Sequence, residues 1–330
     1  MGSPLSRRQT LGLTATAIAG GTAGCLGGDQ PDGTVDYSVL DAIDWANAPP
    51  PKETTAGTQK PVFREYPADG DPDTVLILYH NATLDSRMLT PLASAIAERG
   101  GAHVITPDIR GHGPNPIRRG DSEYVGQLSD DLEAVIATAN SLQRPTPLDE
   151  FDTVIIGGHG AGGGFAARIG ADPLGDSLAD AYLLLAPHLG RLLTPTSRRA
   201  FGGWQRFNVQ SALVAGLFNG LGVGLYNDTE VVSYEMPESA RYGGETRSYT
   251  FRLATDLVPN EHTVVTEIEQ PTLTLVGSDD EAVIPSAYES LLADSDGSQV
   301  SILDGLSHLD LMAHPKTLEA TIAWIESLGG

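Results

Sequence analysis

Residues 155–164 of this chain, Ile-Ile-Gly-Gly-His-Gly-Ala-Gly-Gly-Gly, begin as an apolar strand and end as a run of very small residues. The pattern predicts a nucleophile elbow of the G-x-S-x-G type, a sharp strand-to-helix turn where crowded backbones leave room only for small flanking residues. Gly158, Ala161 and Gly162 supply those flanks. The nucleophile position itself is Gly160, which carries no hydroxyl. This one position decides which chemistry the chain can perform.

Strands and helices alternate on both sides of the elbow. Such a rhythm predicts an α/β fold, a mostly parallel sheet with helices on both faces, whose sites lie at the carboxyl ends of the strands. We expect apolar strands at residues 62–66, 74–79, 103–106, 153–157, 181–186, 272–276 and 300–303, and amphipathic helices at 86–99 and 125–141.

The alternation stops between residues 187 and 266, a segment rich in aromatic residues and glycine. This composition suits a cap inserted over the site, so the expected core is 61–186 plus 267–330. Apolar cap surfaces fit acyl or aromatic groups of a substrate. A cap that merely packs on its own domain shows the same residues, so the pattern alone does not identify the substrate.

Four short segments carry a resemblance to a known family: residues 76–81, the loop 108–113, the elbow, and the pair 277–280 with 307–310. Over roughly residues 60 to 328 the chain resembles the α/β-hydrolase superfamily, in its lysophospholipase and serine-aminopeptidase-like branch. The resemblance implies the α/β-hydrolase fold and the hydrolysis of carboxylic esters or amides, lipid-derived ones among them, without a cofactor.

The resemblance also assigns roles in the order nucleophile, acid, histidine. It places Asp280 as the acid and His308 as the base, which the acid would orient and stabilise in its charged form. Asp279 and Glu281 are neighbouring acids and remain alternatives to Asp280.

An oxyanion hole of backbone N–H groups is expected beside the elbow. Ala161 would donate one N–H, and a second would come from the loop after Tyr79, near Asn81 or Ala82. This chain has His80-Asn81 where the family usually has His-Gly, which leaves the second donor open. His112, in the 108–113 loop, and His159, just before the nucleophile position, are interpreted as structural.

Glycine at position 160 excludes acyl-enzyme chemistry there, because losing the nucleophile of a serine protease lowers turnover by about 10⁶. Three routes remain. His308 activates a water in the vacated space, or a hydroxyl such as Ser86 or Thr83 replaces the serine. In the third route the chain catalyses nothing and is a pseudo-hydrolase that keeps the pocket for binding a ligand, or keeps only the scaffold. If glycine alone disables the site, Gly160→Ser should create ester hydrolysis that His308→Ala abolishes.

Other site chemistries find little support in the sequence. No pair of histidines has the i, i+4 spacing of a zinc helix and no cysteine cluster exists, so no metal site is expected. The glycines of 157–164 resemble a dinucleotide loop, but no acidic residue ends a following strand about 20 residues on.

Charge further limits the partners. The 330 residues carry a formal net charge of −23, from 43 acidic and 20 basic residues, and only Lys52, Lys60 and Lys316 are lysines. Nucleic acid is therefore an unexpected partner. The same balance is typical of proteins from salt-loving archaea, in which concentrated salt screens self-repulsion, and an acidic mesophilic protein is the alternative.

The amino terminus predicts export. Arg7-Arg8 precede a weakly apolar run, 11–23, that is too short to span a bilayer and is typical of a twin-arginine signal peptide. Cys25, the only cysteine, follows Thr-Ala-Gly and resembles a lipobox cysteine, which would make it the lipidated first residue of a mature lipoprotein. The alternatives are a cleaved signal with an incidental cysteine and an uncleaved anchor.

Removal of residues 1–24 would leave Cys25 on the outer face of the cell membrane. Residues 25–60 are rich in Gly, Asp, Pro and Thr, which predicts a flexible tether between the lipid and the body. Within it Tyr37, Leu40, Ile43 and Trp45 are expected to form a short helix or turn that docks on the body.

Overall fold

The structure is a computed structural model that describes residues 35–54, 60–70, 72–113, 118–140, 151–173, 175–191, 194–198 and 203–329. The predicted signal peptide and Cys25 lie outside the described residues, so both remain predictions. No helix among the described residues is long and apolar enough to cross a membrane.

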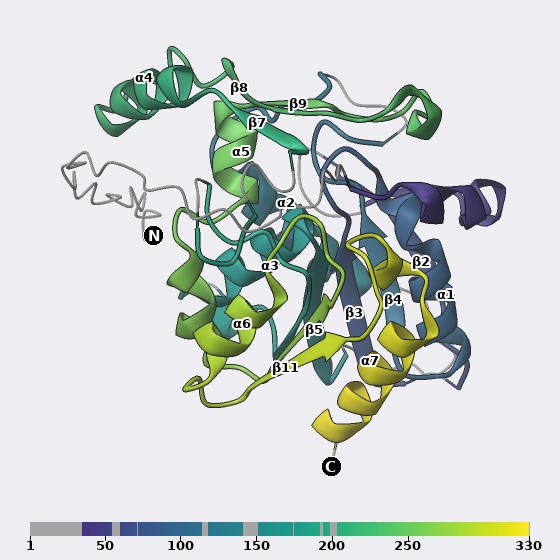
Figure 1. Cartoon of the computed structure of the whole chain (residues 1–330). Helices are drawn as coiled ribbons and strands as arrows, with labels where there is room; N and C mark the ends of the chain where they lie inside the picture. Colours follow the sequence, from purple (N-terminus) through teal and green to yellow (C-terminus); the bar gives the residue numbers. More distant parts are fainter. Residues whose placement is uncertain are drawn as a thin grey trace, which may run out of the picture.

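An eight-stranded sheet forms the centre of the molecule, in the order β1-β2-β4-β3-β5-β6-β10-β11 (Figure 1). Neighbouring strands run parallel from β4 to β11, whereas β1 and β2 join the edge in antiparallel pairings. The strands are β1 (Lys52–Glu53), β2 (Val62–Tyr66), β3 (Thr74–Tyr79), β4 (His103–Pro107), β5 (Thr153–His159), β6 (Ala181–Leu185), β10 (Thr272–Gly277) and β11 (Ser298–Leu303). The prediction of a mostly parallel sheet is confirmed, as are all seven expected strands.

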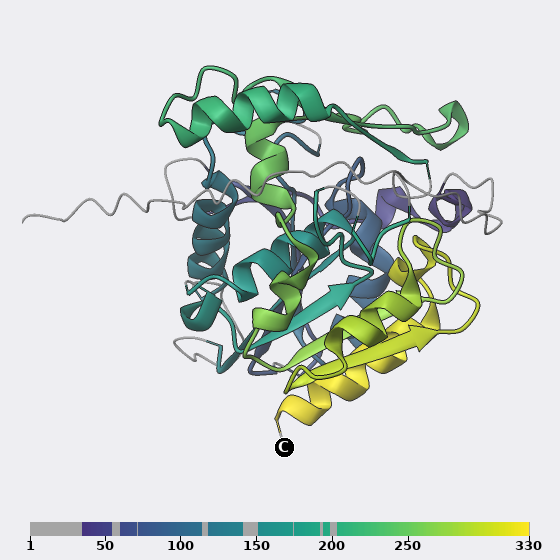
Figure 2. The same cartoon turned by 60° about the vertical axis from the view of Figure 1, so that its left-hand side comes forward.

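Helices cover both faces of this sheet. Helices α1 (Thr90–Glu98) and α7 (Pro315–Leu328) lie together on one face, and α2 (Gln127–Ala139), α3 (Ala161–Gly170) and α6 (Pro285–Leu292) lie on the other (Figures 1 and 2). The helix expected at 86–99 begins as a 3-10 turn, η3 (Ser86–Leu89), because Asp85 accepts the N–H of Arg87 and starts the turn there.

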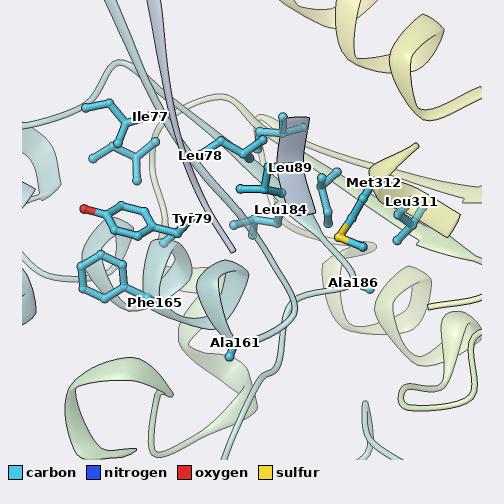
Figure 3. Packing of buried hydrophobic residues seen from close by; sticks show 14 of the residues in the cluster. Ile77, Leu78, Tyr79, Leu89, Ala161, Phe165, Leu184, Ala186, Leu311 and Met312 are labelled. Carbon is cyan, nitrogen blue, oxygen red and sulfur yellow. The ribbon is translucent and has the colours of Figure 1, made fainter. Parts of the chain in front are cut away.

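The core lies between the sheet and these helices. Every residue of β4, β6 and β10 is buried, as expected for strands covered on both faces. Figure 3 shows Tyr79, at the end of β3, against Phe165 of α3, with ring centroids 4.9 Å apart in an edge-to-face arrangement. The packing anchors the strand and the helix that deliver the loops of the site.

The insertion forms a separate layer over the body (Figure 1). A small antiparallel sheet, β7-β8-β9, holds it together, and a bridge between Thr83 and Thr246 joins it to the loop after β3. It therefore covers the carboxyl ends of the parallel strands. Its elements are β7 (Gln205–Phe207), α4 (Val209–Gly220), β8 (Glu230–Tyr234), η5 (Glu238–Ala240), β9 (Ser248–Thr250), α5 (Phe251–Leu257) and η6 (His262–Glu267).

Part of the expected tether is ordered and packs on the body. The short helix η1 (Ser38–Ala42) is followed by η2 (Trp45–Asn47), and Tyr37, Leu40 and Ile43 are buried. The Trp45 ring stacks on Tyr242 of the insertion, with centroids 5.1 Å apart. The expectation that these residues dock is confirmed, which leaves residues 25–34 as the chain between Cys25 and the docked segment.

Candidate active site

The elbow has the backbone shape that its sequence predicts. Gly160 stands between β5 and α3 with φ +52° and ψ −111°, a conformation that side-chain-bearing residues rarely adopt. A Cβ on Gly158 would lie 2.2 Å from the carbonyl carbon of Gly162, and one on Gly162 would lie 2.6 Å from the carbonyl oxygen of Tyr79. The small flanks are therefore required by the close approach of β3, β5 and α3.

Asp280 and His308 come together on the loops after β10 and β11. Asp280 Oδ2 lies 2.8 Å from His308 Nδ1, and the two side chains are 0% and 2% exposed. The other carboxylate oxygen accepts backbone N–H groups from Ala282 and Val283 at 2.8 Å each. Of the three neighbouring acids, Asp280 is the one that hydrogen-bonds the imidazole ring. Glu281 accepts the backbone N–H of His308 instead.

The charge of Asp280 governs the protonation of His308. Burial alone lowers the pKa of the imidazole, but the negative charge and hydrogen bond of Asp280 outweigh it and raise the pKa above its usual value. His188 behaves in the opposite way: burial and the nearby His308 lower its pKa to about 3. His159 has its pKa lowered by the same two causes, and its Nε2 donates to the backbone carbonyl of His308 at 2.9 Å.

The side chain of Asn81 occupies the oxyanion hole. Its Oδ1 accepts the backbone N–H of Ala82 at 2.7 Å and that of Ala161 at 3.0 Å, so both expected donors converge on one atom. Its Nδ2 lies 3.1 Å from His308 Nε2. Two N–H donors require an acceptor, which fixes the amide with its oxygen in the hole and its NH₂ toward His308. His308 is then neutral and donates from Nδ1 to Asp280.

Asn81 also fills the space that a nucleophile would need. A Cβ built on Gly160 would lie 2.0 Å from Asn81 Oδ1 and 2.4 Å from its Cγ. In this arrangement the Asn81 carboxamide occupies the space in which the water-activation route would place its water. A serine at position 160 would meet this carboxamide, so the expectation that Gly160→Ser alone creates activity requires the Asn81 side chain to move and stays a prediction.

His80 holds the backbone on which Asn81 stands. Its Nε2 accepts the backbone N–H of Ile109 at 3.0 Å, so its Nδ1 carries the proton and donates to the carbonyl of Asn81 at 2.8 Å. Burial lowers the pKa of His80 and keeps this tautomer neutral. The sequence shows a non-glycine at position 81 but not that its side chain fills the oxyanion hole, since only the fold brings Asn81 to the elbow.

The remaining candidates have other contacts. Ser86 Oγ accepts from Arg64 Nε at 3.1 Å, and the N–H of Thr83 donates to the Tyr249 hydroxyl at 2.9 Å. No hydrogen bond between either hydroxyl and His308 is present among the described residues. His112 contacts the same Tyr249 hydroxyl at 2.7 Å, in keeping with its interpretation as structural.

A small cavity lies among residues of the insertion. Its volume is about 10 Å³, and His188, Gln205, Tyr234 and Tyr249 are among the residues that line it. This volume is close to the minimum that one water needs. In the described part of the chain, no group of three or more His, Cys, Asp or Glu side chains is arranged to hold a metal ion.

Solved structures with this architecture include lipases and esterases. A soluble variant of monoglyceride lipase from Saccharomyces cerevisiae, in complex with a substrate analog, matches with a TM-score of 0.63 and 14% identity over 85% of this chain and 96% of that one. Monoacylglycerol lipase from Paleococcus ferrophilus matches with a TM-score of 0.61 and 15% identity, covering 82% and 99%. A Bacillus subtilis carboxylesterase matches with a TM-score of 0.54 and 14% identity, covering 89% and 96%. These likenesses show the fold.

The family is shown by the sequence itself. No curated protein matches the chain significantly. The family model for serine aminopeptidase S33 matches residues 70–312, from the start of the parallel sheet to the turn after His308. The chain therefore belongs to the serine aminopeptidase S33 family and has the α/β-hydrolase fold.

Proposed function

We propose that the protein is a pseudo-hydrolase, an α/β-hydrolase scaffold that performs no acyl-enzyme catalysis and acts at the cell surface through binding. The observation that carries this proposal is the Asn81 carboxamide, which sits in the oxyanion hole beside a glycine at the nucleophile position. Lipases and esterases are among the solved structures that share the fold, so the ligand class to test first is a lipid-derived ester or amide.

The base and the oxyanion donors of a hydrolase site are present, but Asn81 is hydrogen-bonded to both. The Asp280–His308 pair is formed, yet His308 Nε2, the atom that would take a proton, already accepts from Asn81. The two backbone donors that would stabilise an oxyanion already bind Asn81 Oδ1. Because both the base and the electrostatic stabilisation are engaged internally, the resting site offers a substrate neither.

The alternative is slow hydrolysis with His308 activating a water. The intact hydrogen bond to Asp280 favours it, since a base held in this way is the usual proton acceptor of a hydrolase. The water would have to displace Asn81 from both His308 and the oxyanion hole. We therefore rank this route below the binding function.

Ester hydrolysis by four forms of the chain tests the proposal: the natural chain, Gly160→Ser, Asn81→Gly, and the double variant. We expect no turnover above the His308→Ala background in the first three. The double variant should hydrolyse a short-chain ester roughly 10² times faster or more, because it regains a nucleophile and frees both donors. Adding His308→Ala to the double variant should abolish that gain.

Two outcomes would contradict the proposal. Turnover by the natural chain that disappears with His308→Ala would identify a working enzyme using water. A fully active Gly160→Ser single variant would show that Asn81 moves aside easily and that glycine alone disables the site. For the binding role, a monoacylglycerol ether, which cannot be hydrolysed, should raise the melting temperature of the natural chain.

We further propose that export and anchoring follow the expected route, with Cys25 as the lipidated first residue. Supporting this is the sequence around Cys25, the only cysteine, which follows Thr-Ala-Gly at the end of the apolar run 11–23. Mass spectrometry of the membrane-extracted protein should find a covalently attached lipid on Cys25, and Cys25→Ser should abolish this modification.

A further inference from the structure

The insertion exposes an unusual concentration of large apolar side chains. Nine large hydrophobic residues are exposed in the described part of the chain, and eight of them belong to residues 209–226. We call this segment, α4 with the turn that follows it, the apolar hairpin. The eight are Val209, Leu213, Val214, Leu217, Leu221, Val223, Leu225 and Tyr226.

The apolar hairpin presents a continuous stripe. Leu213, Leu217 and Leu221 follow one another at intervals of four residues, which places them on one face of the helix, and they are 63%, 65% and 72% exposed. Only Ala215 of α4 is buried. A helix in a layer over the body normally turns its apolar face inward, whereas these leucines are exposed. Figures 1 and 2 show α4 in the layer at the top of the molecule, away from the central sheet.

Charge is absent from the same segment. Residues 209–226 contain no Asp, Glu, Lys or Arg, although charged residues make up 19% of the chain and the net charge is −23. An exposed apolar surface without charged groups is poorly suited to water and typical of a protein or membrane contact. The lack of Lys and Arg also means that anionic headgroups would not attract it.

The position of Val35 relative to Cys25 favours a membrane over a protein partner. Val35 and Tyr37 line a groove together with Pro237 and Ala240 of the insertion, the layer that carries the apolar hairpin. Val35 is ten positions after Cys25 in the sequence, so the two residues are at most about 35 Å apart. A lipid on Cys25 would thus hold this layer close to the bilayer, a step that rests on the proposed anchoring.

We propose that the apolar hairpin inserts into the surface of a lipid bilayer and docks the insertion on the membrane. Leu213, Leu217 and Leu221 enter the boundary between headgroups and acyl chains, while the acidic body stays in water. Because the hairpin is uncharged and the body is negative, docking is driven by apolar burial and opposed by anionic lipids.

Vesicle co-sedimentation tests this proposal without relying on lipidation or catalysis. The full chain carrying Cys25→Ser is mixed with phosphatidylcholine vesicles in concentrated salt, and its partition is compared with that of the triple variant Leu213→Gln, Leu217→Gln, Leu221→Gln. We expect the triple variant to lose roughly 10²-fold or more in partition. Phosphatidylglycerol vesicles should bind the parent more weakly at low salt, and added salt should remove that difference.

Tyr124 offers a matched control, because it is the one exposed large hydrophobic residue outside the apolar hairpin in the described chain. Tyr124→Gln should leave partition unchanged. Equal partition of the parent and the triple variant would overturn the proposal. So would a parent that ignores vesicles and instead forms a dimer that the triple variant cannot form, since the hairpin would then be an interface between copies of the chain. Matching circular dichroism shows that the variants fold.

Discussion

Asn81 and Gly160 are a matched pair, because a side chain at position 160 and the observed carboxamide cannot occupy the same space. The elbow and the Asp280–His308 pair were predictable, since each follows a recognisable strand end in the sequence. The role of Asn81 was not. It contacts Ala161, 80 positions away in the chain, and the contact depends on a side-chain rotamer that only the packed structure defines.

The pairing predicts non-additive stabilities. Gly160→Ala should destabilise the protein by about 2 kcal/mol or more, because alanine at φ +52° is strained and its Cβ would meet Asn81 Oδ1. Adding Asn81→Ala should relieve the collision, so that mainly the strain of alanine at a positive φ remains. The destabilisation of the double variant should therefore be smaller than the sum of the two single variants by about 1 kcal/mol or more. Guanidinium unfolding of the four forms of this cycle measures it.

Gly305 provides the control for that cycle. It has φ +75° with no atom within 4 Å of a built Cβ, so Gly305→Ala reports the backbone cost without a collision. Additivity of Gly160→Ala and Asn81→Ala within about 0.5 kcal/mol would refute the idea that the two positions exclude each other.

The strands of the centre were easier to predict than those of the edge. β3 and β6 are nearly continuous apolar runs, which is the strongest local sign of a strand buried on both faces. β1 is two exposed residues, Lys52 and Glu53, and it exists because β2 offers it an edge to pair with. Its sequence carries no apolar pattern from which a strand could be inferred.

Three strands of that edge are joined by the carboxylate of Glu65, and the stability that this contact contributes depends on pH. Glu65 of β2 binds His103 of β4 at 3.1 Å and also pairs with Lys52 of β1. The hydrogen bond from His103, with help from Lys52 and against burial, lowers the pKa of Glu65 to about 2. Its stabilising contribution is therefore complete above the ordinary carboxyl value of 4.5 and is lost as the pH falls toward 2.

Glu65→Gln should remove this part of the acid sensitivity. Melting temperatures between pH 6 and pH 2 should show the variant less stable than the parent at the upper end and the two converging at the lower end. Glu53→Gln, at an exposed position of the neighbouring strand, should leave the difference unchanged. A constant gap between parent and Glu65→Gln across the whole range would show that the contact does not depend on ionisation of Glu65.

At the scale of the whole molecule, the acidic surface and the apolar hairpin both make the behaviour of the protein depend on salt. Acidic residues outnumber basic ones by 43 to 20, so the folded chain repels itself in dilute buffer. Salt relieves that repulsion and also strengthens apolar contacts, which favours both the compact fold and membrane docking. The composition was readable from the sequence, whereas the exposed face of α4 was not, because a glycine-rich apolar helix is equally compatible with burial.

We expect the melting temperature to rise steeply with sodium chloride up to about 1 M, where the screening length has fallen to roughly 3 Å, and more slowly beyond. Neutralising four exposed acids, as Glu98→Gln, Glu133→Gln, Glu319→Gln and Glu326→Gln together, should raise stability in dilute buffer and flatten the salt response, because less repulsion is left to screen. Sucrose at matched osmolality is the control, since it stabilises compact states without screening charge. A salt response that is identical in the parent and the neutralised variant, or that sucrose reproduces, would mean that charge repulsion does not limit the stability of this fold.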